Sequence, residues 1–111
     1  MNEPVLKRTA IGLREIGLDR NDISYSGLPT INEATDWLYE KHEIVIVVVP
    51  YYESKGKLKW VYSVFKLNEN MGEEISGNDA EIYGEPTRTE AQTAGIDAAI
   101  TYIKNLKNGT K

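Results

Sequence analysis

The sequence Pro29-Thr30-Ile31-Asn32-Glu33-Ala34 recurs as a pattern in Pro86-Thr87-Arg88-Thr89-Glu90-Ala91, and both stretches read P-T-x-x-E-A. Each contains Thr-x-x-Glu, in which the threonine hydroxyl accepts a hydrogen bond from a free N–H of the first helical turn. The glutamate then reaches back to the N–H of the capping threonine. Proline disfavours helix in the residue before it, so the helix start is sharply placed. The two stretches therefore predict two helix starts with strand-like sequence between them, which describes architecture rather than chemistry.

The sequence between these two helix starts predicts an antiparallel hairpin. The run from Glu43 to Pro50 is β-branched without alternation, which is typical of a central strand covered on both faces or of a strand in a tightly packed small sheet. A turn at residues 53–57 separates it from a second strand, Leu58 to Leu67, with apolar side chains on both faces. A polar loop over residues 68–80 follows, and Glu81-Ile82-Tyr83 predicts a short third strand at the sheet edge.

Helices are expected before and after this hairpin. The first is predicted from about Glu3 to Gly17, with Pro4 at its first position and Gly17 as its C-terminal cap. The two capped helices are predicted from Ile31 to about Lys41 and from the second P-T-x-x-E-A stretch to about Leu106. We therefore predict an α+β fold in the order α-α-β-β-(β)-α, in which helices pack a small antiparallel sheet of two or three strands.

The length of 111 residues suits one domain, which we expect to span residues 1–111. We divide it into an N-terminal helix and connector (1–28), an α-β-β-β-α core (29–107) and a tail (108–111). The chain has no cysteine, which excludes disulfides, thiolate metal sites and cysteine nucleophiles and is compatible with a reducing cytoplasm. The N-terminal residues lack the apolar core of a signal peptide, and no apolar run is long enough to span a membrane. The expected location is therefore cytoplasmic.

The net charge of −4 is concentrated in one segment, residues 68–85, which contains no Lys or Arg. Its acidic residues are Glu69, Glu73, Glu74, Asp79, Glu81 and Glu85. This segment would repel a phosphate backbone, and no strongly basic face exists elsewhere, so the charge argues against nucleic acid as a partner. A solvated loop is the plainest interpretation. A hard-cation site at Asn78, Asp79 and Glu81 and a loop that mimics nucleic acid stay open as alternatives.

Catalytic and cofactor motifs are absent from the sequence. There is no Gly-rich phosphate loop, no G-x-S-x-G elbow and no H-E-x-x-H. His42 is the only histidine, and with Glu40 and Glu43 nearby it could serve as a general base or as one metal ligand. We favour a structural role at the end of a helix, because a zinc site would need further histidine or cysteine ligands. We therefore expect no catalytic residues, no metal, no cofactor and no enzymatic activity.

Aromatic residues are the candidates for contact with a partner, because the chain contains seven Tyr and two Trp and aromatics are enriched at protein interfaces. The predicted contact residues are Tyr51, Tyr52, Trp60 and Tyr83. Lysines interleave with these aromatics at Lys55, Lys57 and Lys59, a pattern that can also support weak binding of single-stranded nucleic acid. Homodimerisation through the hairpin edge or the last helix is a further alternative.

The stretch from Pro29 to Lys66 carries a resemblance. Its pattern is P-T, then Ala34, Trp37-Leu38, Glu40, His42, Ile44, Ile46, Pro50, Trp60, Tyr62 and Val64. This resembles a group of small proteins of unknown function from gut Bacteroidetes and their phages. The resemblance implies an α-β-β-β-α fold and an origin in a phage or mobile element, and it implies no activity. We therefore favour a non-enzymatic protein-interaction module or accessory factor, with weak nucleic-acid binding or acidic inhibition by nucleic-acid mimicry as alternatives.

Overall fold

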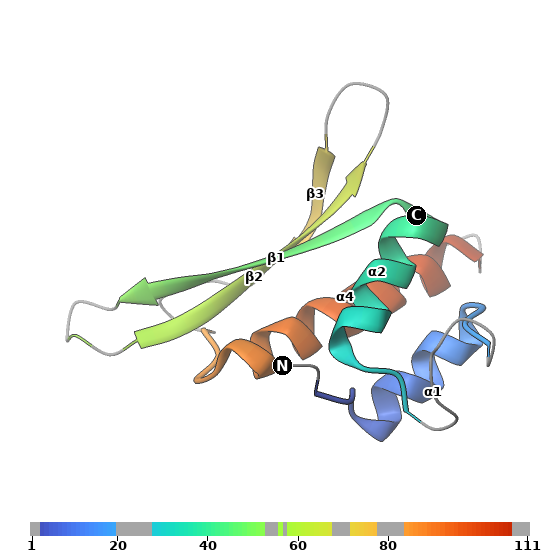
Figure 1. Ribbon diagram of the computed structural model, residues 1–111. Coiled ribbons are helices and arrows are strands. Elements are labelled where there is room, and N and C mark those ends of the chain that lie inside the picture. Colours follow the sequence, from blue (N-terminus) through green and yellow to red (C-terminus); the bar gives the residue numbers. More distant parts are fainter. Residues whose placement is uncertain are drawn as a thin grey trace.

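The computed structural model describes residues 3–19, 28–52, 56, 58–67, 72–77 and 84–107. The elements along the chain are α1 (Lys7–Glu15), α2 (Ile31–His42), β1 (Ile44–Tyr52), β2 (Leu58–Leu67), β3 (Gly72–Gly77) and α4 (Arg88–Lys107). The strands form an antiparallel sheet in the order β1-β2-β3, and the helices lie together on one side of it (Figure 1). The predicted α+β class, with an antiparallel sheet packed by helices, is confirmed. None of the described helices is both long enough and apolar enough to cross a membrane.

The core lies between the sheet and the helices. Its fully buried side chains come from every helix and from both long strands; the largest include Leu13, Leu38, Ile44, Val64 and Ile96. Helix α4 packs directly on the hairpin at Gly95, where an added Cβ would lie 2.6 Å from Cγ2 of Ile46. The missing side chain therefore lets the helix backbone approach the sheet closely.

Both predicted helix caps are present. At α2 the N–H of Glu33 donates to Oγ1 of Thr30 at 3.1 Å, and the N–H of Thr30 donates to Oε1 of Glu33 at 2.9 Å. At α4 the N–H of Glu90 donates to Oγ1 of Thr87 at 3.1 Å. The return bond differs there, because the hydroxyl of Thr87 donates to the Glu90 carboxylate at 2.9 Å. Each threonine satisfies one N–H that the first helical turn leaves without a partner.

The predicted start of the first helix at Glu3 is wrong. Pro4 instead forms an antiparallel bridge with Thr30, and the helix begins at Lys7. Two backbone hydrogen bonds hold this bridge, from the Val5 N–H to the Pro29 carbonyl at 2.9 Å and from the Ile31 N–H to the Glu3 carbonyl at 2.7 Å. Pairing with the entry to α2 therefore takes the Glu3 carbonyl, which a helix that began there would have used as an acceptor, and it satisfies the Val5 N–H, which such a helix would have left without a partner.

The predicted polar loop over residues 68–80 is also wrong in part, because it contains strand β3. This strand pairs with β2 from Ser63 opposite Gly77 to Leu67 opposite Gly72, with a register shift between Val64 and Phe65. Its sequence, Gly-Glu-Glu-Ile-Ser-Gly, has weak strand propensity, so the pairing comes from the available edge of β2 rather than from local preference. The third strand predicted at residues 81–83 lies outside the described residues.

Candidate functional site

The β1–β2 hairpin has two different faces. Residues opposite each other in an antiparallel pair point to the same face, and successive residues alternate between faces. Ile46 and Tyr62 lie against Gly95 of α4, so the even-numbered residues of both strands form the covered face. The odd-numbered residues form what we call the open face: Val45, Val47, Val49 and Tyr51 from β1, with Lys59, Val61, Ser63, Phe65 and Leu67 from β2.

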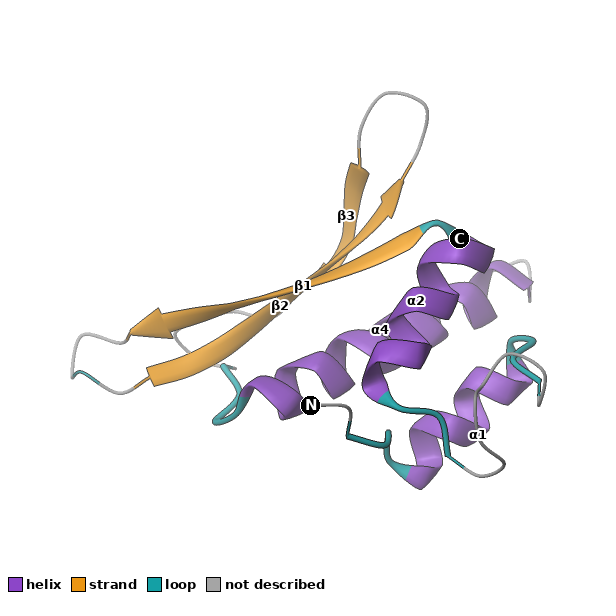
Figure 2. Ribbon diagram, viewed as in Figure 1, coloured by secondary structure: helices purple, strands orange, loops and turns teal. Residues whose placement is uncertain are grey.

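The open face is largely apolar, and no described helix packs on it (Figure 2). The side chains of Val47 and Val49 are 41% and 45% exposed, whereas Val64 on the covered face is completely buried. Of the two arrangements predicted for this strand, the central strand covered on both faces is therefore wrong. Among the described strands, β1 pairs only with β2, so it forms one edge of the sheet.

The distal end of the hairpin projects beyond the helices (Figure 1). Tyr52 at the end of β1 is 70% exposed, and its cross-strand partner Leu58 is 40% exposed. The covered face is therefore covered only along its proximal part. The hairpin therefore carries a group of exposed large apolar side chains, which comprises Tyr52, Leu58 and the exposed valines of the open face. Such groups mark interaction sites in soluble proteins.

The residues predicted to bind a partner do not share one face. Tyr51 and Lys59 are cross-strand partners on the open face, where both are half-buried. Tyr52 and Trp60 belong to the opposite face, and the backbone of Trp60 exchanges two hydrogen bonds of 2.8 Å with Glu85. The predicted residues Lys55, Lys57 and Tyr83 lie outside the described residues.

The sequence-based prediction missed the valines of the open face. Their only signal was the β-branched run Ile44–Val49, which reads the same for a buried strand and for an edge strand with one uncovered face. The exposure of these valines depends on where the helices pack, which is information that the local sequence does not contain.

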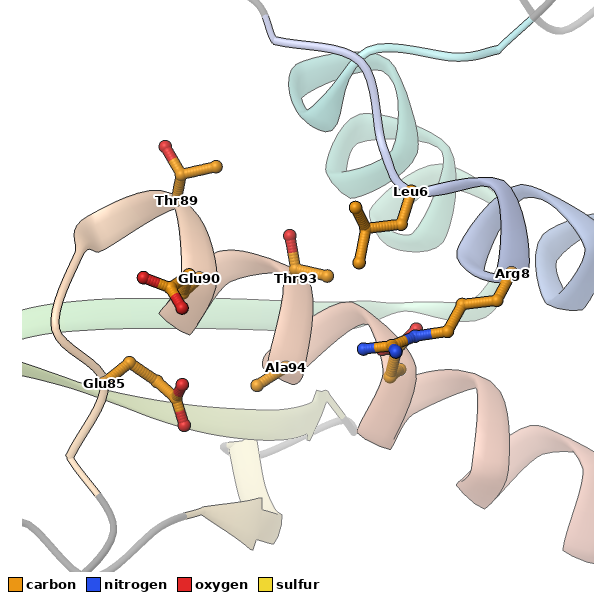
Figure 3. A pocket seen from close by; sticks show the side chains of 8 residues that line it. Leu6, Arg8, Glu85, Thr89, Glu90, Thr93 and Ala94 are labelled. Atoms are coloured by element: carbon orange, nitrogen blue, oxygen red, sulfur yellow. The ribbon is translucent and has the colours of Figure 1, made fainter.

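A groove of about 460 Å³ lies between the start of α1 and the first turns of α4 (Figure 3). Its polar groups are largely used within the fold. Oδ1 of Asp97 accepts a hydrogen bond from the Thr9 hydroxyl at 2.8 Å, and Oδ2 lies 3.8 Å from the Arg8 guanidinium. Thr89 donates to Glu3 at 3.3 Å, and Glu90 belongs to the helix cap. The polar side chains around the groove therefore act chiefly to hold α1 and the residues before it against α4.

His42 ends α2, as expected for a structural residue. Its ring packs edge-on against Trp37, with the ring centroids 5.0 Å apart. The ammonium group of Lys66 donates to the His42 carbonyl at 2.9 Å and lies 3.6 Å from the Glu43 carboxylate, which ties the helix end to β2. Within the described residues, no three His, Cys, Asp or Glu side chains gather closely enough to hold a metal ion. The surroundings of His42 favour support of the helix-to-strand corner over chemistry.

Comparison of the chain with protein-family models, with curated proteins and with solved structures finds no match.

Proposed function

We propose that this protein is a non-enzymatic protein-interaction module that binds its partner through the open face of the β1–β2 hairpin. The observation that carries the proposal is the exposure of Val47 and Val49, at 41% and 45%, on a face that no described helix packs against. Full burial of an exposed valine side chain is worth about 1.5 kcal/mol or more, and Val47 and Val49 have less than half of that burial left to gain. Covering both valines therefore contributes about 1 kcal/mol or more to binding.

The shape of the surface favours a protein over a small molecule. Small ligands bind in concave pockets, whereas the open face is one side of a sheet. Its valines form an apolar centre, and Tyr51 and Lys59 lie toward the distal end as an aromatic contact and a polar neighbour. An apolar centre beside polar and aromatic groups is the usual composition of a protein interface. On the resemblance described above, we further propose that the partner belongs to a process of a phage or mobile element.

Site-specific photo-crosslinking tests this proposal. Val49 is replaced by the photoreactive residue p-benzoylphenylalanine, and the matched control carries the same residue in place of Asn105, which is exposed on α4. We expect a protein adduct from position 49 and not from position 105, and we expect it to survive nuclease treatment. Equal adducts from both positions, loss of the adduct with nuclease, or no protein adduct from position 49 would contradict the proposal.

The purified partner then allows a quantitative test. Val47→Glu combined with Val49→Glu places two charges on the open face, where they lose hydration on binding. We expect the affinity to fall at least tenfold, which corresponds to about 1.4 kcal/mol. Asn105→Glu, an added charge on α4, is the control and should leave the affinity within about twofold, because it lies away from the proposed interface. If the double variant bound the partner with unchanged affinity, the open face would be excluded as the binding surface.

A further inference from the structure

The hydrogen-bonding direction along β2 follows from two observed pairs. Trp60 exchanges hydrogen bonds with Glu85 on the side away from β1, whereas the Leu67 N–H donates to the Glu43 carbonyl at 2.9 Å on the side of β1. Backbone groups alternate in direction along a strand. The odd-numbered residues of β2 therefore bond to β1, and the even-numbered residues point to the other side.

The backbone groups on the free edge of β1 are then defined by register. Val45, Val47 and Val49 lie opposite odd-numbered residues of β2 and bond to them. The N–H and C=O groups of Ile44, Ile46 and Val48 therefore point away from β2, toward an edge that no described strand pairs with. These groups are the kind that recruit an added strand.

The position of Pro50 supports this assignment of outward backbone groups, independently of the two hydrogen-bonded pairs. Pro50 is the next residue in the outward series, and proline has no N–H, so its position in the strand removes no bond to β2. A proline at an inward position would have left a carbonyl of β2 without its donor. Pro50 also limits an added strand, because the outward N–H groups before it end at Val48.

We propose that the free edge of β1 pairs antiparallel with β1 of a second copy of this chain. This rests on the proposed function, in which the hairpin is the interaction surface, and it names one partner for the hairpin edge. A two-fold axis beside Ile46 places Ile46 opposite its own counterpart and Ile44 opposite Val48 of the second copy, so each outward N–H in this window meets a carbonyl. The contact is self-complementary, as an isologous dimer interface requires.

The distribution of charged residues favours pairing of a second copy with the β1 edge and opposes pairing at the β3 edge. The strand from Ile44 to Tyr52 contains no charged residue, so the net charge of −4 on each copy produces no direct repulsion where the strands meet. The opposite edge, β3, is short and carries Glu73 and Glu74 in its sequence. Like charges across a strand pair are destabilising, and acidic edges discourage pairing. Pairing through β1 also joins the two open faces into one larger surface.

Sedimentation velocity over a range of protein concentrations tests the inference. Val48→Pro removes an outward N–H without breaking a bond to β2, and Val48→Ala is the matched control because it trims the side chain but keeps the N–H. We expect the unmodified chain to dimerise on concentration, Val48→Pro to raise the dissociation constant at least about tenfold, and Val48→Ala to change it by less than about threefold. An unmodified chain that stays monomeric, or a control as weak as the proline variant, would overturn the inference.

Amide hydrogen exchange in the unmodified chain gives a second readout that does not depend on a variant folding. The amides of Ile46 and Val48 should exchange quickly in dilute protein and slowly in concentrated protein, whereas those of Val45 and Val47 stay slow in both. Equal exchange of Ile46 and Val48 at both concentrations would overturn the edge pairing. A chain that stays monomeric yet crosslinks a different protein from position 49 overturns this inference alone and leaves the proposed function supported.

Discussion

The two faces of the β1–β2 hairpin contain similar side chains in opposite surroundings. Val64 on the covered face is completely buried under the helices, whereas Val49 on the open face is 45% exposed. The same two strands provide both residues, so strand propensity alone cannot explain the difference. One apolar face is enough to build the core with α4. The second apolar face adds little to that core, which is why we propose it as the surface that binds another chain.

The packing of α4 on the covered face should be most sensitive to substitution of Gly95, which lies on α4 against Ile46. Gly95→Leu forces a side chain into the space where Ile46 approaches to 2.6 Å of an ideal Cβ, so we expect the free energy of unfolding to fall by about 3 kcal/mol. Urea denaturation followed by circular dichroism measures the loss. The control Asn105→Leu adds the same side chain at an exposed position of α4 and should stay within about 0.5 kcal/mol. A Gly95→Leu variant as stable as this control would show that α4 does not press on the hairpin there.

A matched pair of valine substitutions compares the two faces directly. Val64→Ala leaves a cavity in the core, and we expect it to lower the free energy of unfolding by about 2 kcal/mol. Val49→Ala removes the same atoms from the open face and should lower it by less than about 0.5 kcal/mol. The measurement is again chemical denaturation, and equal losses for the two variants would mean that the open face is covered in solution.

The position of α4 under the covered face depends on a partly buried hydrogen bond from α1. Thr9 is 1% exposed, and its hydroxyl donates to the Asp97 carboxylate at 2.8 Å. We expect Thr9→Val, which keeps the shape of the side chain, to lower the free energy of unfolding by about 1.5 kcal/mol, because a bond to a charged acceptor is lost. Thr101→Val on the exposed side of α4 is the control and should change it by less than about 0.5 kcal/mol. A similar loss in both variants would refute this role for Thr9.

The smallest effect is expected for the ion pair between Lys104 of α4 and Glu15 of α1, whose side chains are 41% and 52% exposed. Exposed ion pairs are screened by solvent and contribute little to stability. Lys104→Ala should lower the free energy of unfolding by less than about 1 kcal/mol, and added salt should reduce the difference further. A loss larger than that for Thr9→Val would show that surface charge rather than buried contact fixes the helix.

Local signals predicted the parts of the fold that local chemistry determines. The Thr-x-x-Glu pairs at Thr30 and Thr87 start their helices as predicted, and Gly17 follows α1 with a positive φ of 118°. Strands β1 and β2 pair as the predicted hairpin, with β1 extending slightly beyond Pro50.

The remaining features depend on contacts between distant parts of the chain. The bridge of Pro4 with Thr30, the bond from Thr9 to Asp97 and the pairing of β3 with β2 all join residues that no short window contains. The exposure of the open face also depends on contacts between distant parts of the chain. Its valines give one β-branched pattern whether a helix covers them or not, so only the packed structure separates the two faces.

Methyl NMR of the valine side chains is the most direct test of the open face as the binding surface. A soluble paramagnetic probe is added to the free protein and to its complex with the crosslinked partner. We predict strong broadening of the Val47 and Val49 methyl signals in the free protein, loss of that broadening in the complex, and little broadening of Val64 in either state. Val47 and Val49 methyls that stay equally accessible to the probe in the complex would contradict the proposed interface.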